Sequence, residues 1–187
     1  MATRLIFIRH ARHKTDPSVH QIEWVLNAEG EEQARGIARN AELALADILC
    51  ASEETKARLT LAPLAEKLGK DIVISSAFNE VWREKNFLTD EEFALEKKRQ
   101  LADLDCHAFN GESGNEALAR MKAGVDLLCK QYPNKTIIIA THGTILSIYF
   151  ADVLGVLDEL PKRWQKTAFG AYGIIEDGKV IKDIVTE

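Results

Sequence analysis

Two short runs of apolar residues that favour β-strands each end in a histidine. Residues 4–8 run directly into Arg9 and His10, and residues 136–141 run into His142. Neither run alternates apolar with polar side chains, which is typical of a strand buried on both faces of a parallel sheet. Open α/β sheets bind ligands at the carboxyl ends of their strands. The sequence therefore predicts an α/β fold that brings the two histidines to the same edge of a sheet.

Helical patterns lie between these strands in the first part of the chain. Asn27 is a suitable N-cap for a helix whose apolar spacing extends to residue 48, although residues 47–51 also suit a second strand. Ser52 is expected to open the next helix, and Gly69 to end it as a C-cap.

The later part of the chain repeats the alternation. We expect a strand at residues 71–74, helices at 90–103 and through 118–128, and a terminal hairpin over 170–185 that turns at Asp177 and Gly178. The predicted architecture is a three-layer α/β/α sandwich with a mostly parallel central sheet.

The composition is that of an ordinary globular domain. With 187 residues, of which 46% are hydrophobic, the chain can bury a substantial core, and we expect residues 1–187 to form a single domain. No run approaches the roughly 20 apolar residues of a membrane span, and no secretory signal is recognisable, so we expect a cytoplasmic protein that binds no membrane. The net charge of -5 and the lack of a basic patch argue against a nucleic-acid partner. The three cysteines lack Cys-x-x-Cys spacing and are expected to be free thiols.

The residues at the two strand ends are suited to binding an anion. Arg9 supplies a positive charge, and Gly143 stands at the start of a helix whose N–H groups and dipole favour a phosphate group. A single histidine at a strand end is more often a hydrogen-bonded structural residue. The pair together indicates an electropositive site.

Six short segments resemble, in order and spacing, the motifs of the histidine phosphatase superfamily, whose fold is phosphoglycerate mutase-like. They are residues 5–11 for the strand with its Arg-His-Gly signature, 26–34 for Leu-Thr-x-x-Gly-x-x-Gln-Ala, 52–60 for Ser-x-x-x-Arg-Ala-x-x-Thr, 78–80 for Leu-x-Glu, 111–113 for Gly-Glu-Ser and 141–143 for the second histidine. The resemblance spans nearly the whole chain.

The resemblance implies a phosphatase that transfers a phosphoryl group from a small phosphorylated metabolite onto His10 and then to water. Arg9 and Lys56 would bind the phosphate, His142 would be a second group of the phosphate pocket, and Glu80 would donate and accept protons. A neutral imidazole can attack phosphorus, and nearby cations would keep His10 neutral by lowering its pKa. Neither a metal nor another cofactor is then required.

Three positions depart from the family pattern. Ala11 replaces a glycine, which matters only if the backbone there has a positive φ. Lys56 replaces an arginine and loses its planar fork, and Arg58 would point to another face of the helix. Asp16 replaces an asparagine near the phosphate and would repel a dianion unless a cation such as Arg12 pairs with it.

Other polar residues in these segments are rival candidates. Glu84 would share a helical face with Glu80, but the motif favours Glu80. His13 and His20 flank Asp16, and they could face the mouth of the pocket or belong to a metal site. No cysteine or close acidic set completes a coordination shell, so solvent-facing loop histidines are the favoured interpretation.

Several aromatic residues fall in the segment that covers the pocket in the family. They are Trp82, Phe87, Phe93 and Phe109. These residues could either shape the substrate site or pack in the core, and the sequence does not decide between the two roles.

Three functions fit these observations. The first is a phosphomonoesterase, the second an isomerase of the phosphoglycerate mutase type, and the third a weakly catalytic member that binds a phosphorylated ligand or a protein partner. The altered residues Ala11, Lys56 and Asp16 are the support for the third. The short chain between Glu80 and Thr136 favours hydrolysis, because a mutase must shield phosphohistidine from water. The sequence specifies neither the substrate nor an oligomeric state.

Overall fold

The computed structural model describes residues 3–84 and 88–185. Within them, six strands form one sheet in the order β3-β2-β4-β1-β5-β6. The first four strands of the chain pair in parallel, and β5 and β6 pair antiparallel to their neighbours. The strands are β1 (Arg4–Arg9), β2 (Ile48–Ala51), β3 (Ile72–Ile74), β4 (Thr136–Thr141), β5 (Tyr172–Glu176) and β6 (Lys179–Lys182). The predicted α/β fold with a mostly parallel sheet is confirmed.

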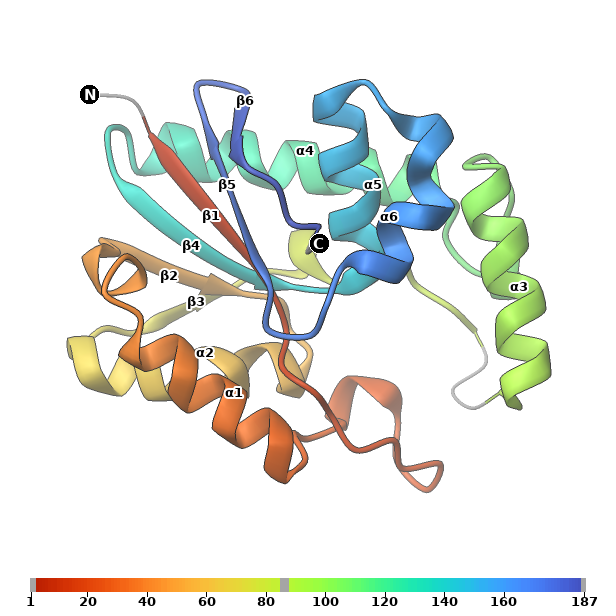
Figure 1. Ribbon diagram of the computed structural model, residues 1–187, viewed down its shortest axis with the longest axis horizontal. Coiled ribbons are helices and arrows are strands. Elements are labelled where there is room, and N and C mark those ends of the chain that lie inside the picture. The colour runs from red at the N-terminus through yellow and green to blue at the C-terminus, as the bar shows by residue number, and fades with distance from the viewer. Residues whose placement is uncertain (1–2, 85–87, 186–187) are drawn as a thin grey trace.

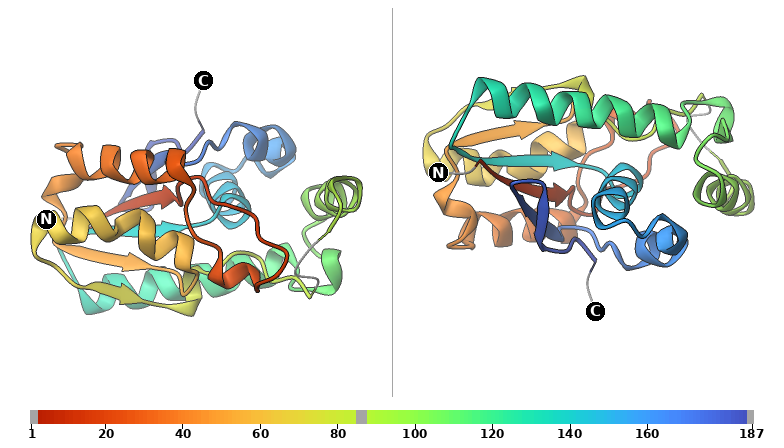
Figure 2. Two further views of the ribbon diagram at one scale, coloured as in Figure 1. Left: turned by 90° about the horizontal axis from the view of Figure 1, so that it is seen from below. Right: turned by 90° about the horizontal axis from the view of Figure 1, so that it is seen from above.

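Helices cover both faces of the sheet (Figure 1 and Figure 2). α1 (Ala28–Arg39) and α2 (Thr55–Leu68) lie on one face, and α4 (Gly114–Gln131) and α5 (Gly143–Leu154) lie on the other. α3 (Asp90–Ala102) stands beyond the carboxyl ends of the parallel strands, and α6 (Leu160–Lys166) packs against both α3 and α5. Short 3-10 turns occur at Gln21–Glu23, Leu43–Leu45, Ser76–Phe78, Ala108–Asn110 and Leu157–Glu159. The layers form the predicted α/β/α sandwich.

The central strand β1 is buried on both of its faces, as its unbroken apolar sequence predicts. Leu5 and Phe7 pack in the cluster formed with α4 and α5, whereas Ile6 and Ile8 pack in the cluster formed with α1 and α2. The strand is therefore fixed from both sides up to its carboxyl end. The main-chain N–H of His10 donates to the carbonyl of Thr141, the last residue of β4, over 2.8 Å. This pairing brings the ends of the two histidine-bearing strands together.

The helix after Asn27 is shorter than its apolar spacing predicts. The Asn27 side chain accepts from the N–H of Gly30, as expected of an N-cap, but α1 ends at Arg39 rather than near residue 48. Ile48 instead begins β2, where it pairs with Ile137 of β4, so the alternative of a strand at residues 47–51 is confirmed. Pairing in the middle of the sheet outweighs the local helical pattern at these residues.

Ser52 does not begin the second helix. α2 begins at Thr55, and the Ser52 hydroxyl contacts His142 Nε2 over 2.7 Å. Gly69 ends α2 in the left-handed conformation, with φ 61°, as predicted. The terminal hairpin also turns at Asp177 and Gly178, both at positive φ.

α6, a short helix with Pro161 in its first turn, has no counterpart among the predicted elements. None of the helices in the described ranges has both the length and the apolar character that a membrane crossing requires.

Candidate active site

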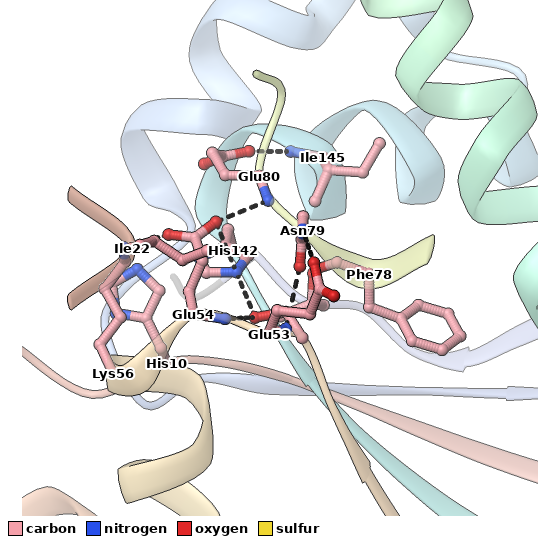
Figure 3. A network of polar contacts seen from close by, with 12 residues as sticks. His10, Ile22, Glu53, Glu54, Lys56, Phe78, Asn79, Glu80, His142 and Ile145 are labelled. Atoms are coloured by element: carbon pink, nitrogen blue, oxygen red, sulfur yellow. Dashed lines mark hydrogen bonds and ion pairs between the residues drawn. The ribbon is translucent and has the colours of Figure 1, made fainter. Parts of the chain in front are cut away.

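A cavity of about 300 Å³ opens where β1 and β4 end. This volume is at the lower end of the usual range for ligand pockets, about 300 to 1,000 Å³, and suits a small metabolite. Its polar wall includes Arg9, His10, Glu54, Lys56, Glu80, His142 and Gly143. Figure 3 shows how His10, Lys56, Glu54, Glu80 and His142 converge from different segments of the chain. Six of the eight predicted site residues thus lie around one cavity.

His10 is held in the form that a nucleophile needs. Its side chain is buried, and its Nδ1 lies 2.8 Å from the carbonyl oxygen of Ala11. A carbonyl only accepts, so Nδ1 carries the proton and Nε2 keeps its lone pair. Burial lowers the pKa of His10 well below 6.5, and the nearby His142, Lys56 and His13 lower it further. The sequence predicted a neutral His10 from neighbouring cations, but burial is the larger cause.

Arg9 places a guanidinium beside His10. It donates to the carbonyl of Thr167 and lies 3.8 Å over the ring of Phe169. Burial lowers its pKa to about 10, so it stays cationic at neutral pH. Its Nε is buried and has no hydrogen-bond partner among the described residues. Gly143 allows this approach, because a Cβ there would lie 2.8 Å from the guanidinium carbon.

His142 precedes α5 and is fully buried. Its Nε2 lies 2.7 Å from the Ser52 hydroxyl and 3.1 Å from a carboxylate oxygen of Glu54. Its Nδ1, by contrast, has no partner within the part of the chain that the structure describes. Burial lowers the pKa of His142 to about 4, although the Glu54 carboxylate opposes that shift. A bound anion would therefore favour protonation of this histidine.

Lys56 and Glu54 form a buried ion pair at the start of α2. Lys56 is 5% exposed and Glu54 is 7% exposed, and the ammonium donates both to Glu54 and, over 3.1 Å, to the carbonyl of Gln21. Lys56 lines the cavity as predicted, whereas Arg58 is exposed and donates to Thr55. Sequence reasoning missed Glu54, because a glutamate two residues before Lys56 carries no signal of its own.

Glu80 accepts three main-chain hydrogen bonds. The N–H groups of Thr144 and Ile145, in the first turn of α5, each donate to it over 3.0 Å, and the N–H of Val81 does the same. Burial would raise its pKa, but attraction to His142 and Lys97 together with these N–H groups lowers it to about 2. The expectation that the start of this helix holds a phosphate needs correction, because Glu80 occupies two of its N–H groups.

Glu84, the rival of Glu80, lies elsewhere. It is exposed, accepts a hydrogen bond from Asn110 over 3.3 Å and is absent from the cavity wall. The position of Glu80 therefore agrees with the motif.

Ala11 and Asp16 do not line the cavity. Ala11 is fully buried beside Leu26, and its φ is not positive, so the missing glycine causes no strain there. The Asp16 carboxylate turns back onto the N–H and hydroxyl of Ser18, over 2.9 and 2.6 Å. These contacts lower the pKa of the Asp16 carboxyl group.

His13 takes the pocket-facing position that the sequence left open rather than the favoured solvent-facing one, whereas His20 is exposed as favoured. His13 lines the cavity, stacks on Trp24 and lies 5.2 Å from the ring of His10, whereas His20 caps the turn at Gln21–Glu23. Burial lowers the pKa of His13 to about 4. No group of three or more potential metal ligands occurs in residues 3–84 and 88–185.

The aromatic residues of the covering segment divide into two kinds. Phe93 and Phe109 line the cavity, whereas Trp82 is 54% exposed and lies outside it. Phe87 lies outside the described residues. The cavity also contains Trp164 of α6, which the sequence gave no reason to select.

Comparisons with known proteins agree with this fold. A probable phosphoglycerate mutase, GpmB, from Enterobacter sp. (strain 638) is 26% identical over 137 residues, which cover 70% of this chain and 64% of that protein. The structure of a mycobacterial glucosyl-3-phosphoglycerate phosphatase with VO3 is similar with a TM-score of 0.82, 18% identity and coverage of 99% of this chain and 100% of that one. A putative alpha-ribazole-5'-P phosphatase from Escherichia coli is similar with a TM-score of 0.75, 19% identity and coverage of 100% and 97%. The model of the histidine phosphatase superfamily (branch 1) matches residues 5–184, and the chain belongs to that family.

Proposed function

We propose that the protein hydrolyses small phosphomonoesters through a phosphohistidine formed on His10. The observation that carries this proposal is the hydrogen bond from His10 Nδ1 to the Ala11 carbonyl, which leaves Nε2 as the free nucleophilic nitrogen in a cavity lined with cations. The phosphatases and the probable mutase among the relatives support a reaction at phosphorus.

In the first half of the reaction, His10 Nε2 attacks the phosphorus atom while the ester oxygen leaves. Arg9 and Lys56 supply positive charge to the peripheral phosphoryl oxygens, and His142 presents Nδ1 to the same group. Phosphoryl transfer depends mainly on such positioning and charge stabilisation. We therefore propose that no metal takes part.

In this proposal Glu80 donates and accepts protons on the side of the phosphorus atom opposite His10. Its pKa of about 2 makes it a carboxylate in the unliganded site, so it is ready to deprotonate the water that attacks phosphohistidine. For the first half it must carry a proton for the leaving oxygen. A dianionic phosphate close to Glu80 raises its pKa and favours that protonated form.

Hydrolysis is favoured over isomerisation by the amount of chain near the cavity. Between Glu80 and β4 the described residues form two helices, α3 and α4, and α4 packs on the sheet. α3 is the helix left to cover the site, and its Phe93 and Lys97 reach the cavity wall. We propose that this cover admits water to the phosphohistidine.

The experiment is phosphate release from p-nitrophenyl phosphate and a panel of phosphorylated metabolites, with and without EDTA. We expect release that EDTA does not reduce and that His10→Ala abolishes while the circular dichroism spectrum stays unchanged. Undiminished release by His10→Ala would overturn the nucleophile assignment, and loss of activity with EDTA would overturn the metal-free mechanism.

A further inference from the structure

Lys97 of α3 is a buried ammonium that the proposed phosphoryl transfer does not use. It is 7% exposed and lines the same cavity as His10. Its Nζ donates to Gln100 Oε1 over 2.5 Å and to Thr144 Oγ1 over 2.8 Å. Both acceptors are neutral, and no carboxylate of the described residues forms an ion pair with it. One of its three N–H donors is therefore left for another partner.

Burial makes the charge of Lys97 costly, and the faces of three nearby aromatic rings offset only part of that cost. The rings of Phe93, Phe109 and Trp164 lie 5.5, 5.2 and 5.5 Å from the ammonium. Burial lowers the pKa of Lys97 to about 8, although attraction to Glu80 offsets part of that shift. Lysines are rarely buried unless they are paired, and a buried cation in a cleft is a candidate for binding.

Thr144 fixes where Lys97 lies relative to the reaction. The Thr144 hydroxyl accepts from Lys97, and its main-chain N–H donates to Glu80 over 3.0 Å. Because Glu80 is the group that protonates the leaving oxygen in the proposed function, Lys97 lies beside the leaving group. Lys56, by contrast, is one of the cations that lower the pKa of His10, and it lies at the phosphoryl end.

We propose that Lys97, together with Gln100, binds a carboxylate on the leaving-group side of the substrate. The substrate class is then the phosphomonoesters of small hydroxy acids rather than those of neutral alcohols. One ammonium with one free donor balances a singly charged carboxylate, whereas a second phosphate dianion would need further cations. The three rings would pack against the short hydrocarbon part of such a molecule. This inference rests on the proposed function, because it takes the phosphoryl group to lie at His10.

The test compares compounds that differ only by a carboxylate in place of a hydroxymethyl group. Phosphoglycolate is paired with 2-hydroxyethyl phosphate, and 3-phosphoglycerate with glycerol 3-phosphate, so that two spacer lengths are covered. Dissociation constants are measured by calorimetry on His10→Ala, which prevents turnover, with and without Lys97→Met. The matched control is Lys98→Met, since Lys98 is exposed on the same helix and lies outside the cavity.

We expect at least one pair to show about a tenfold or greater preference for the carboxylate compound, a range typical of a hydrogen bond to a charged group. Lys97→Met should reduce the preference to about one, and Lys98→Met should retain it. Equal binding of both members of each pair would overturn the inference and leave the phosphatase proposal intact. Binding of none of the four compounds would overturn both.

A second measurement needs no change at Lys97. The ammonium faces Glu80 and Arg83 from the loop before α3, and Arg9 from β1. The pKa of Lys97 is about 8, whereas that of Glu80 is about 2 and that of Arg9 is about 10. A lysine is charged below its pKa, so the carboxylate preference should be full at pH 7 and should fall as the pH rises above 8. A preference that is constant from pH 7 to 10 would contradict the role of Lys97.

Discussion

The Nε2 atom of His142 lies 3.1 Å from a carboxylate oxygen of Glu54, which also accepts a hydrogen bond from the main-chain N–H of Glu80 over 2.9 Å. Glu54 thereby connects the second histidine with Lys56, its other partner, and with the segment that carries Glu80 (Figure 3). The carboxylate favours the protonated form of His142, and burial opposes it. A bound phosphate dianion adds a second attraction, so binding should be accompanied by proton uptake.

Proton uptake is therefore the first prediction. His142 has a pKa of about 4 in the unliganded site and is neutral at pH 7. Binding of inorganic phosphate or vanadate raises that pKa, so protons are taken up, and the uptake should be smaller in Glu54→Gln. Calorimetry in two buffers of different ionisation enthalpy gives the number of protons. Affinity alone is a poorer measure, because removing the Glu54 charge also makes the cavity more positive.

Glu53→Gln is the matched control for this experiment. Glu53 is the exposed neighbour of Glu54 and accepts a hydrogen bond from Asn79, which a glutamine oxygen can also accept. The number of protons should be unchanged in this variant. Equal uptake by the parent protein and Glu54→Gln would contradict the link between Glu54 and His142.

Lys56 is the subject of the second prediction. A compact ammonium lacks the two parallel hydrogen bonds that a guanidinium offers a phosphate, so Lys56→Arg should tighten inhibition by vanadate. Lys56→Ala should weaken it about tenfold to a hundredfold, as expected for loss of a hydrogen bond to a charged group. Arg58→Ala, which alters an exposed residue outside the cavity, is the control and should change neither inhibition nor turnover. Full activity of Lys56→Ala would exclude Lys56 as a phosphate ligand.

The third prediction separates the two neighbouring glutamates. Glu80→Gln cannot move a proton and should slow turnover about 10²- to 10⁴-fold, with phosphohistidine accumulating because its hydrolysis lacks a base. Glu84→Gln should retain the parent rate, since Glu84 is exposed and lies outside the cavity. Stopped-flow measurement of the p-nitrophenol burst distinguishes the two half-reactions. If Glu84→Gln loses activity and Glu80→Gln keeps it, the assignment is reversed.

The sequence predicted the sheet and the strand-end histidines because these features are local in the chain. An unbroken apolar run such as residues 4–8 is recognisable without a partner, and so is the left-handed glycine at position 69. The sequence left the end of α1 open between a helix that reaches residue 48 and a strand at 47–51, because β2 is defined by pairing with β4, far along the sequence. Glu54, His13 and Lys97 were missed or misjudged for the same reason, since each acquires its role from neighbours on other segments.

The fourth prediction concerns the fate of the phosphoryl group. With 3-phosphoglycerate and a catalytic amount of 2,3-bisphosphoglycerate, phosphate release from the best monoester tested should exceed formation of 2-phosphoglycerate. According to the proposed mechanism, the cover that α3 provides admits water to the phosphohistidine. Product analysis over time decides the question, and isomerisation much faster than any phosphate release would make the protein a mutase.

The central claim, a covalent intermediate on His10, is tested most directly by rapid quenching with substrate labelled in its phosphoryl group. The quench must be alkaline or contain denaturant, because a phosphoramidate is labile in acid. We predict that label appears on the peptide containing His10 at least as fast as steady-state turnover, then declines as substrate is consumed, and is absent in His10→Ala. Normal turnover of the parent protein with no label on His10 at any time would contradict the account.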